Sequence, residues 1–390
     1  MRYAFADCEL DITRHRLLRT GQEVHVEPQV FTLIACLAAA RGALVSYDTL
    51  IDEVWQGRIV SDATIAARIS AARAALGDDG RRQHIIRTVP RRGVQLVATL
   101  SPEPGDTASQ DPPPPARQTV RYTTSKDGTA IAWSESGTGP PLLRGGHWMG
   151  HLEHDWTSPV WRPLLDRLSR GHRLVRYDPR GTGLSDRTMN GAALAELTDD
   201  MEAVTDAAGL DCFPVFATSQ SVPVALMLAA RHPGRISRLV LLNGLVQGST
   251  ARGDGALTET LIGMIRTGWG DPGSAFMRAL ATVFVPDATR AEIDGLMTLQ
   301  ALSSSGAVAA EIRRIIGDID VRDILGRIAC PTLVMHASGD QVQSPEESRI
   351  LARSLANAEF HLLASRNHIL VPSDPAWDGC FDRIEAFLSG

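Results

Sequence analysis

The pattern of apolar and polar residues in the first 100 positions predicts a small domain of short strands and three helices. Residues 1–26 alternate between short apolar stretches and turns, as strands do. Three helical patterns follow, the first from Pro28, the second after Ser46 and the third after Ser61. Residues 85–98, IIRTVPRRGVQLVA, read as two strands around a basic turn, so we expect the domain to end in a hairpin.

From residue 119 to residue 390, strand and helix patterns alternate. The inner strands are continuous apolar runs, such as FPVFA at 213–217 and RLVLLN at 238–243. Such runs are typical of a mostly parallel sheet that helices cover on both faces. Residues 246–330 break the alternation, because their patterns are helical throughout. We therefore predict a doubly wound α/β domain that contains a long helical insertion.

A proline-rich segment separates the two regions. Residues 101–118, SPEPGDTASQDPPPPARQ, contain six prolines and no aromatic residue. Such a segment cannot bury enough apolar surface to fold, and consecutive prolines stiffen it. We therefore expect two domains, residues 1–100 and 119–390, joined by a linker.

The composition favours a globular protein, since 44% of the residues are hydrophobic and 22% are charged. No apolar run has the length of a membrane helix, and the first twenty residues lack the apolar stretch of a signal peptide, so we expect no membrane partner. The five cysteines are far apart, which suits a reducing cytoplasm. No histidine or cysteine spacing indicates a metal site. We expect a cytoplasmic, nucleoid-associated protein without cofactors.

Charge is distributed unevenly between the two regions. Residues 1–100 hold 13 of the 39 Lys and Arg and 11 of the 45 Asp and Glu, a net charge of +2. The other 290 residues therefore carry 26 basic and 34 acidic residues, a net charge of −8. Only the first region is suited to bind nucleic acid.

The third helical pattern and the basic turn contain the candidate DNA-binding residues. Small and basic residues lie on the outer side of the helix, and arginines cluster at residues 81–92, where they could contact phosphates or base edges. Any single arginine is as well explained as a solvated surface residue, but the whole set favours DNA. The candidates are Thr64, Arg68, Ser70, Arg73, Arg87, Arg91 and Arg92.

The first domain resembles the OmpR/PhoB-type winged helix-turn-helix. The resemblance is carried by EPQVFTLIACLAAARGALVSYDTLIDEVW and by GRIVSDATIAARISAARAALGDDGRRQHIIRTVPRRG. It implies double-stranded DNA as the partner, with Ala63–Leu76 as the recognition helix and Arg87–Gln95 as the wing. One difference is that Arg91-Arg92-Gly93-Val94 stands where the family wing usually has a Gly-x-Gly-Tyr sequence.

Three polar residues follow strand ends in the chain order Ser219, Asp340, His368. A serine hydroxyl becomes a nucleophile when an imidazole accepts its proton, and a carboxylate orients that imidazole. The order and positions resemble the α/β-hydrolase fold, which we expect for residues 119–390. The resemblance implies that the backbone amides of Trp148 and Gln220 form the oxyanion hole, with His147 beside them, and that residues 246–330 form a lid.

The nucleophile turn departs from the usual Gly-x-Ser-x-Gly pattern, because Ala217 and Ser221 replace both glycines. Each member of the trio also has a plain alternative: Ser219 as a helix cap, Asp340 in a turn and His368 as a loop histidine. The lid offers candidates for a wall over Ser219. Packing in the lid's own core explains any one of them better, but as a group they favour an apolar or aromatic ligand. The residues considered for that wall are Met264, Trp269, Phe276, Met277, Phe284 and Met297.

These features together suggest a one-component transcription regulator. We expect the winged helix to bind DNA and the hydrolase-like domain to sense a small organic ligand, with the acidic second domain forming a homodimer. The alternative is a serine hydrolase that cleaves an ester, lactone or amide, acting on its own inducer. A third interpretation, a purely structural or dimerising domain, explains the three polar residues less well.

Overall fold

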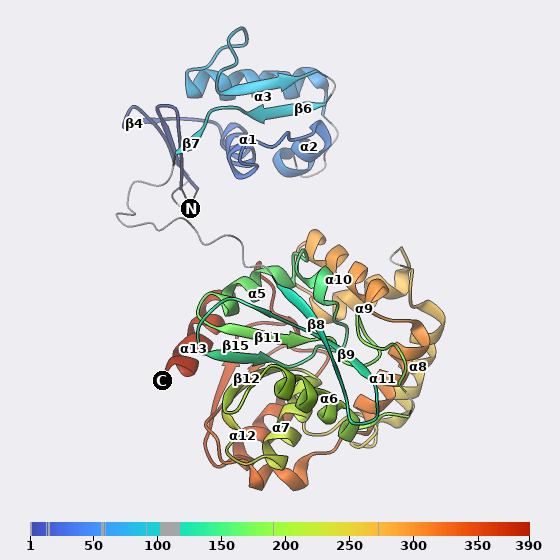
Figure 1. Ribbon diagram of the computed structural model, residues 1–390. Coiled ribbons are helices and arrows are strands. Elements are labelled where there is room, and N and C mark those ends of the chain that lie inside the picture. The colour runs from blue at the N-terminus through green and yellow to red at the C-terminus, as the bar shows by residue number, and fades with distance from the viewer. Residues whose placement is uncertain are drawn as a thin grey trace. The chain divides into compact units, whose positions relative to one another are not determined.

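The computed structural model describes residues 2–12, 14, 16–55, 58, 60–90, 92–101, 118–189, 191–271 and 273–390. The chain divides into two compact units, Met1–Pro112 and Pro113–Gly390 (Figure 1). The division falls inside the proline-rich segment, most of which lies outside the described residues. The first unit mixes short antiparallel strands with helices, and the second contains a mostly parallel sheet. The predicted fold class is confirmed.

The first unit packs three helices between a small sheet and a hairpin. Its sheet is antiparallel and consists of β1 (Arg2–Phe5), β2 (Cys8–Asp11), β3 (Arg16–Arg19), β4 (Gln22–Val24) and β7 (Leu100–Ser101). Its helices are α1 (Pro28–Ala39), α2 (Tyr47–Trp55) and α3 (Asp62–Leu76), and β5 (Ile86–Val89) pairs with β6 (Gly93–Leu96). Apolar side chains of all these helices share one core with the strands.

The residues around α3 fix both its ends. Ser61 caps the start, because its side chain accepts a hydrogen bond from the Thr64 amide at 3.3 Å. Gly77 ends the helix in the left-handed conformation, with φ of 71°. The buried carboxylate of Asp78 then accepts hydrogen bonds from the backbone amides of Ile85 and Ile86 at 2.9 and 2.8 Å. The end of α3 is thereby tied to the start of the hairpin.

The second unit is built on an eight-stranded sheet in the order β15-β14-β13-β12-β10-β11-β9-β8. The strands are β8 (Thr119–Thr124), β9 (Ala130–Ser136), β10 (Pro141–Arg144), β11 (Arg173–Tyr177), β12 (Phe213–Thr218), β13 (Ile236–Leu242), β14 (Thr332–Ala337) and β15 (Ala358–Leu363). Strands β8 and β9 are antiparallel to their neighbours, and the rest are parallel to one another. The carboxyl ends of the parallel strands therefore meet at one edge, where ligands bind in such sheets.

Helices cover both faces of this sheet. On one face, α5 (Trp161–Ser169) and α13 (Trp377–Ser389) pack over side chains such as Phe216 and Leu333. On the other, α6 (Leu194–Ala207), α7 (Ser221–Arg231) and α12 (Pro345–Ser354) pack over Leu143 and Val215. This accounts for the continuous apolar strands, because both sides of each inner strand are buried.

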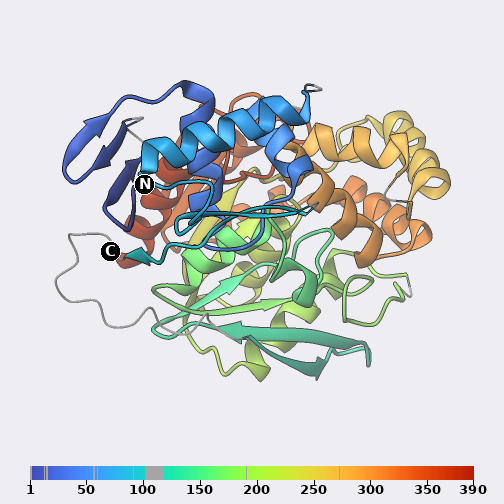
Figure 2. The ribbon, with the colours of Figure 1, turned by 90° about the horizontal axis from the view of Figure 1, so that it is seen from above.

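The described part of residues 246–330 is mostly helical, as its pattern predicts. It contains α8 (Gly255–Gly268), α9 (Ala275–Phe284), α10 (Arg290–Ser303) and α11 (Gly306–Asp318), followed by the short η1 (Arg322–Arg327). In Figures 1 and 2 the four α-helices, coloured yellow to orange, gather at one end of the second unit. We call these four helices the lid.

Candidate functional site

Ser219 stands in the turn between β12 and α7, at the carboxyl end of the central strands. Its φ is 53°, in the left-handed region that costs a residue other than glycine about 1–3 kcal/mol. The Ser219 amide donates to the carbonyl of Leu242 at 3.0 Å, and the Ser219 carbonyl accepts from the amide of Val222 at 3.1 Å. The sharp turn from strand to helix presents the side chain at the edge of the sheet.

The structure accommodates the absence of flanking glycines. The side chain of Ser221 points into the turn, where its Oγ donates to the Thr218 carbonyl and accepts from the Thr218 amide, both at 2.8 Å. Room for it comes from Gly145, because a Cβ at that position would lie 2.8 Å from both Cβ and Oγ of Ser221. A glycine in the loop after β10 thus provides the space that a glycine in the turn usually provides.

Ser219, His368 and Asp340 are brought together in one relay. His368 Nε2 lies 2.8 Å from Ser219 Oγ, and His368 Nδ1 lies 2.6 Å from Asp340 Oδ2. The arrangement suits an Nδ1–H that donates to the carboxylate and leaves Nε2 free to accept the serine proton. All three strand-end residues of the sequence prediction therefore meet at one place.

Asp340 is held in its charged form by its surroundings. Burial acts to raise the pKa of this carboxyl, but the electrostatic interaction with His368 and several hydrogen bonds outweigh burial, so the pKa lies well below its usual range. Asp340 Oδ1 accepts from the amides of Val342 and Gln343 at 2.7 and 3.1 Å. His336 Nε2 also lies 3.4 Å from Asp340 Oδ2. A fixed anion of this kind orients His368.

Sequence reasoning missed a residue that positions the relay, Asn243. It follows β13 with φ of 50°, and its side chain donates to the carbonyl of His368 at 2.7 Å. Its Oδ1 accepts from the amide of Ala337, at the end of the strand that leads to Asp340, at 2.7 Å. Asn243 therefore links the two loops that carry His368 and Asp340. The Asn-Gly pair at the strand end was a usable signal, since asparagine tolerates positive φ.

The backbone amides assigned to the oxyanion hole are available. Gln220 occupies the position just before α7, and Trp148 lies in the loop after β10. Neither amide donates a hydrogen bond to another of the described residues. Both residues line the same cavity as Ser219. Two amides beside the nucleophile are what a developing oxyanion requires.

His147 does not line the cavity that Trp148, Gln220 and Ser219 share. It lines a small hollow with Ser219 and His368, and its ring packs 4.6 Å from the Trp161 ring. Burial, followed by the nearby charge of Arg144, lowers the pKa of His147 to about 3, so the ring is neutral at physiological pH. Its Nδ1 lies 3.3 Å from the carbonyl oxygen of Met149. His147 thus packs between the loop after β10 and Trp161 of α5.

A cavity of about 280 Å³ opens beside Ser219, between the nucleophile turn and the lid. Most of its lining is aliphatic or aromatic, which favours a ligand with a substantial apolar part. The lining residues are Trp148, Ser219, Gln220, Leu257, Thr260, Leu261, Met264, Ile265, Leu280, Val283, Phe284, Arg313, Ile316, Gln341, Val342 and Gln343.

Two of the six proposed lid-wall residues, Met264 and Phe284, line this cavity. Met277 and Met297 are buried in the core instead, Phe276 packs against that core, and Trp269 packs edge-on against Trp148. These four therefore pack in or against the lid's own core, which is the alternative considered for each of them, and do not line the cavity. Helix α8 lines the cavity with Leu257, Leu261 and Ile265, which share one face of the helix. Their spacing predicted an apolar face, but it did not indicate whether that face meets the core or the cavity.

In the first unit, two of the candidate DNA-binding arginines already have partners. Arg73 donates from Nε to the carbonyl of Ile86 at 3.1 Å and from Nη2 to Thr88 Oγ1 at 2.8 Å. Arg68 donates from Nη1 to Glu27 Oε2 at 2.5 Å and from Nε to Gln29 Oε1 at 3.1 Å. Arg73 therefore joins α3 to the hairpin, and a contact of Arg73 with DNA stays a prediction.

The remaining candidates differ in exposure. Ser70, Arg87 and Arg92 are exposed, while Thr64 is half-buried and its hydroxyl lies 3.0 Å from Ser61 Oγ. Arg91 lies outside the described residues. The exposed surface of α3 and the hairpin thus keeps basic and small polar side chains that can approach phosphates.

None of the described helices is both long and apolar enough to cross a membrane. No group of three or more His, Cys, Asp or Glu among the described residues is arranged to hold a metal ion.

Comparison with known families gives one match in each unit. Residues 21–96 match the family "Transcriptional regulatory protein, C terminal", and residues 147–279 match "alpha/beta hydrolase fold". The chain therefore has an OmpR/PhoB-type transcription-regulator domain followed by an α/β-hydrolase domain. The transcriptional activator CadC of Escherichia coli (strain K12) is 32% identical over 115 residues, which are 28% of this chain and 22% of CadC.

Several of the similar proteins are hydrolases. The 2-hydroxymuconate semialdehyde hydrolase of Pseudomonas sp. (strain CF600) is 28% identical over 246 residues, 60% of this chain and 82% of that enzyme. The enol-lactonase of Burkholderia xenovorans LB400 superimposes with a TM-score of 0.56 at 22% identity, covering 69% of this chain and all of that one. The esterase RhEst1 of Rhodococcus sp. ECU1013 has a TM-score of 0.59 at 22% identity, with 70% and 98% covered. The structural likenesses establish the fold.

The packing of Gly145 against Ser221 predicts a paired effect. Gly145→Ala should lower the free energy of unfolding by about 1–3 kcal/mol, because the new methyl group overlaps the Ser221 side chain. Adding Ser221→Gly should recover most of that loss. Urea denaturation followed by tryptophan fluorescence measures both, with Gly171→Ala, where a Cβ meets no atom within 4 Å, as the control. Equal losses in Gly145→Ala and in the double variant would show that this contact is not the cause.

Because Arg73 and Arg92 have different surroundings, we predict that alanine at one position lowers stability and at the other lowers DNA affinity. Arg92→Ala should weaken binding to duplexes of any sequence and reduce the slope of log affinity against log salt by about 0.9, because one phosphate contact is lost. Arg73→Ala should instead lower the stability of the first unit by about 1–3 kcal/mol, since it removes hydrogen bonds to the hairpin. Fluorescence anisotropy across a salt series and thermal denaturation separate the two. An Arg73→Ala protein of unchanged stability and reduced salt slope would contradict the assignment.

Proposed function

We propose that this chain, with its transcription-regulator and α/β-hydrolase domains, is a one-component regulator that binds DNA and receives a small organic ligand at Ser219. The winged helix supplies the DNA contacts, and the cavity under the lid supplies the ligand site. The single observation that carries the proposal is that the cavity opens onto Ser219 while His368 lies within 2.8 Å of its hydroxyl. We place the protein in the cytoplasm as a homodimer, since two linked winged helices bind paired half-sites far better than one.

The geometry also favours the second function, hydrolysis of the ligand. Ser219 Oγ would attack a carbonyl carbon while His368 Nε2 takes its proton, and Asp340 stabilises the imidazolium. The amides of Trp148 and Gln220 would hold the oxyanion, and His368 would pass the proton to the leaving group. A water molecule then releases the acyl group by the same steps in reverse. The names of the neighbours, an enol-lactonase and an esterase, support an ester or lactone.

The two functions are compatible, because a regulator that cleaves its own inducer resets itself. The departures from the usual nucleophile turn do not weaken this reading. Ser221 is accommodated opposite Gly145 and its hydroxyl is bound within the turn, so it does not compete with Ser219 as the nucleophile. The relay is assembled with hydrogen-bond distances that proton transfer needs.

Covalent labelling tests the competence of the relay. The full chain, treated with an alkyl fluorophosphonate, should gain the mass of one adduct, and Ser219→Ala should gain none. Asp340→Asn should keep the serine but slow labelling by about 10³–10⁴-fold, because the imidazole is left in the wrong tautomer. Intact-mass spectrometry over time gives both results. Absence of an adduct from protein with a native circular dichroism spectrum would reject hydrolysis.

A further inference from the structure

One charged residue, Arg313 on α11, lines the cavity beside Ser219. The polar residues that share the lining, such as Thr260 and Gln343, are neutral. Ile316, one turn further along α11, lines the same cavity, so this face of the helix is directed at the ligand space. A cation in an otherwise uncharged and largely apolar cavity is costly to maintain unless something pairs with it.

Arg313 has no acidic partner among the described residues. Its Nη2 donates to Ser249 Oγ at 2.9 Å, and Ser249 Oγ lies 2.6 Å from Thr258 Oγ1. Burial lowers the pKa of Arg313, and the positive charge of Arg252 lowers it further. A guanidinium has five N–H donors and stays charged, and most of these donors remain available to a ligand.

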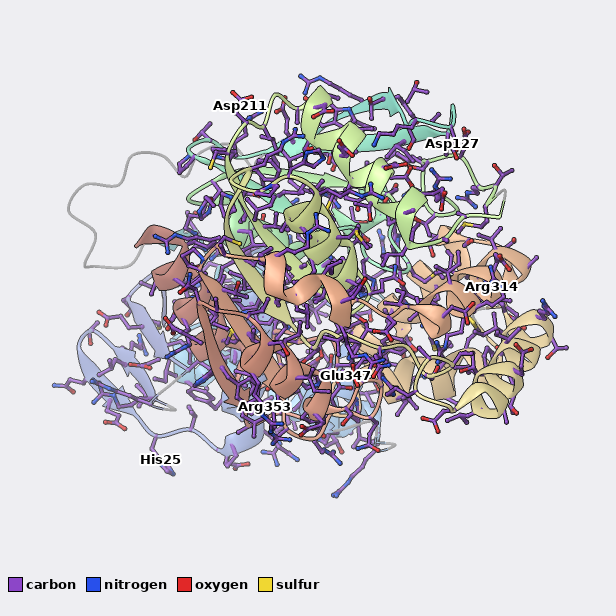
Figure 3. The ribbon with its side chains drawn as sticks, turned by 90° about the horizontal axis from the view of Figure 1, so that it is seen from below. His25, Asp127, Asp211, Arg314, Glu347 and Arg353 are labelled. Atoms are coloured by element: carbon purple, nitrogen blue, oxygen red, sulfur yellow. The ribbon has the colours of Figure 1, made fainter. Side chains whose placement is uncertain are left out.

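Arg314, the next residue on α11, has acidic partners, in contrast to Arg313. Arg314 pairs with Glu311 at 2.7 Å, one turn before it, and with Asp318 at 2.9 Å, one turn after it. It lies at the edge of the lid, where Figure 3 labels it. Helix α11 therefore neutralises Arg314 with its own carboxylates and leaves Arg313 unpaired.

The rest of the cavity suits a hydrocarbon chain. Leu257, Met264 and Val283 line it and yet are 69%, 49% and 45% exposed, so apolar surface continues to its mouth. Exposed apolar residues grouped around a cavity typically mark a binding surface. The cavity thus offers an apolar path with a nucleophile and a separate cation in its lining.

We propose that Arg313 is an anion subsite and that the ligand is an organic carboxylate, whose apolar chain carries a second, reactive acyl group. The carboxylate pairs with Arg313, the chain lies along the aliphatic lining, and the ester, lactone or amide carbonyl reaches Ser219. A charge-assisted pair with guanidinium is stronger than a neutral hydrogen bond and selects carboxylates by shape. The placement of the reactive carbonyl rests on the proposed function, whereas the anion subsite does not need catalysis.

Binding to the Ser219→Ala protein tests the subsite without turnover. The probes are the monomethyl and dimethyl esters of straight-chain diacids of six, eight and ten carbons, followed by tryptophan fluorescence because Trp148 lines the cavity. At the best chain length the monoester should bind about tenfold more tightly than the diester. Arg313→Met should abolish that preference, and Arg314→Met should preserve it. Equal binding of the two esters, binding of neither, or equal effects of the two substitutions would overturn the proposal.

Turnover of the same esters by protein with Ser219 intact separates this inference from the proposed hydrolysis. Acid release, followed by titration, should show that Arg313→Met raises KM for the monoester about tenfold and leaves the diester unchanged. Cleavage of both esters without dependence on Arg313 would overturn the subsite and leave hydrolysis in place. Preference for the monoester without any cleavage would leave the subsite in place and reject hydrolysis.

Discussion

The left-handed backbone of Ser219 is the constraint on which the rest of the second domain depends. A side chain in that conformation is strained, and the strain persists only where the surroundings hold the turn. Here the turn is held by the Leu242 carbonyl, by the Ser221 hydroxyl and by the start of α7. Gly145 gives the space that this turn needs and begins the loop that carries Trp148. One local conformation thus fixes Ser219 and the start of the loop that carries Trp148, whose amide we propose as one side of the oxyanion hole.

The lid is joined to this centre through Phe284, at the end of α9. Its carbonyl accepts a hydrogen bond from the His368 amide at 2.8 Å, and its ring packs edge-on against the His368 imidazole. The same ring stacks on Trp148 with the ring centres 5.9 Å apart. A ligand that changes the packing of α9 would therefore act on the histidine and on the oxyanion loop together. This is a physical route by which ligand binding in the cavity could alter the domain.

The strands, the helices, the two-domain division and the strand-end positions of Ser219, Asp340 and His368 were predictable, because apolar periodicity and local end signals determine them. The lining of the cavity was not predictable, because the apolar residues of a lid helix lie on more than one face. Only the tertiary packing places Met277 in the core and Leu257 in the cavity lining. The bond of Arg73 to Ile86 could not be predicted for the same reason: its place on α3 was clear, but the bond needs the folded hairpin. The contacts of Asn243 and Arg313 are with residues far away in the sequence, so the local pattern did not indicate their roles.

We propose that ligand binding or covalent modification at Ser219 changes the affinity of the winged helix for DNA. The most direct measurement is the affinity of the full chain for genomic DNA fragments that it enriches, before and after complete modification of Ser219 by a fluorophosphonate. We expect a change of about fivefold or more in specific affinity, the usual range of coupling between sites, with non-specific affinity unchanged. Identical affinities for modified and unmodified protein would contradict it.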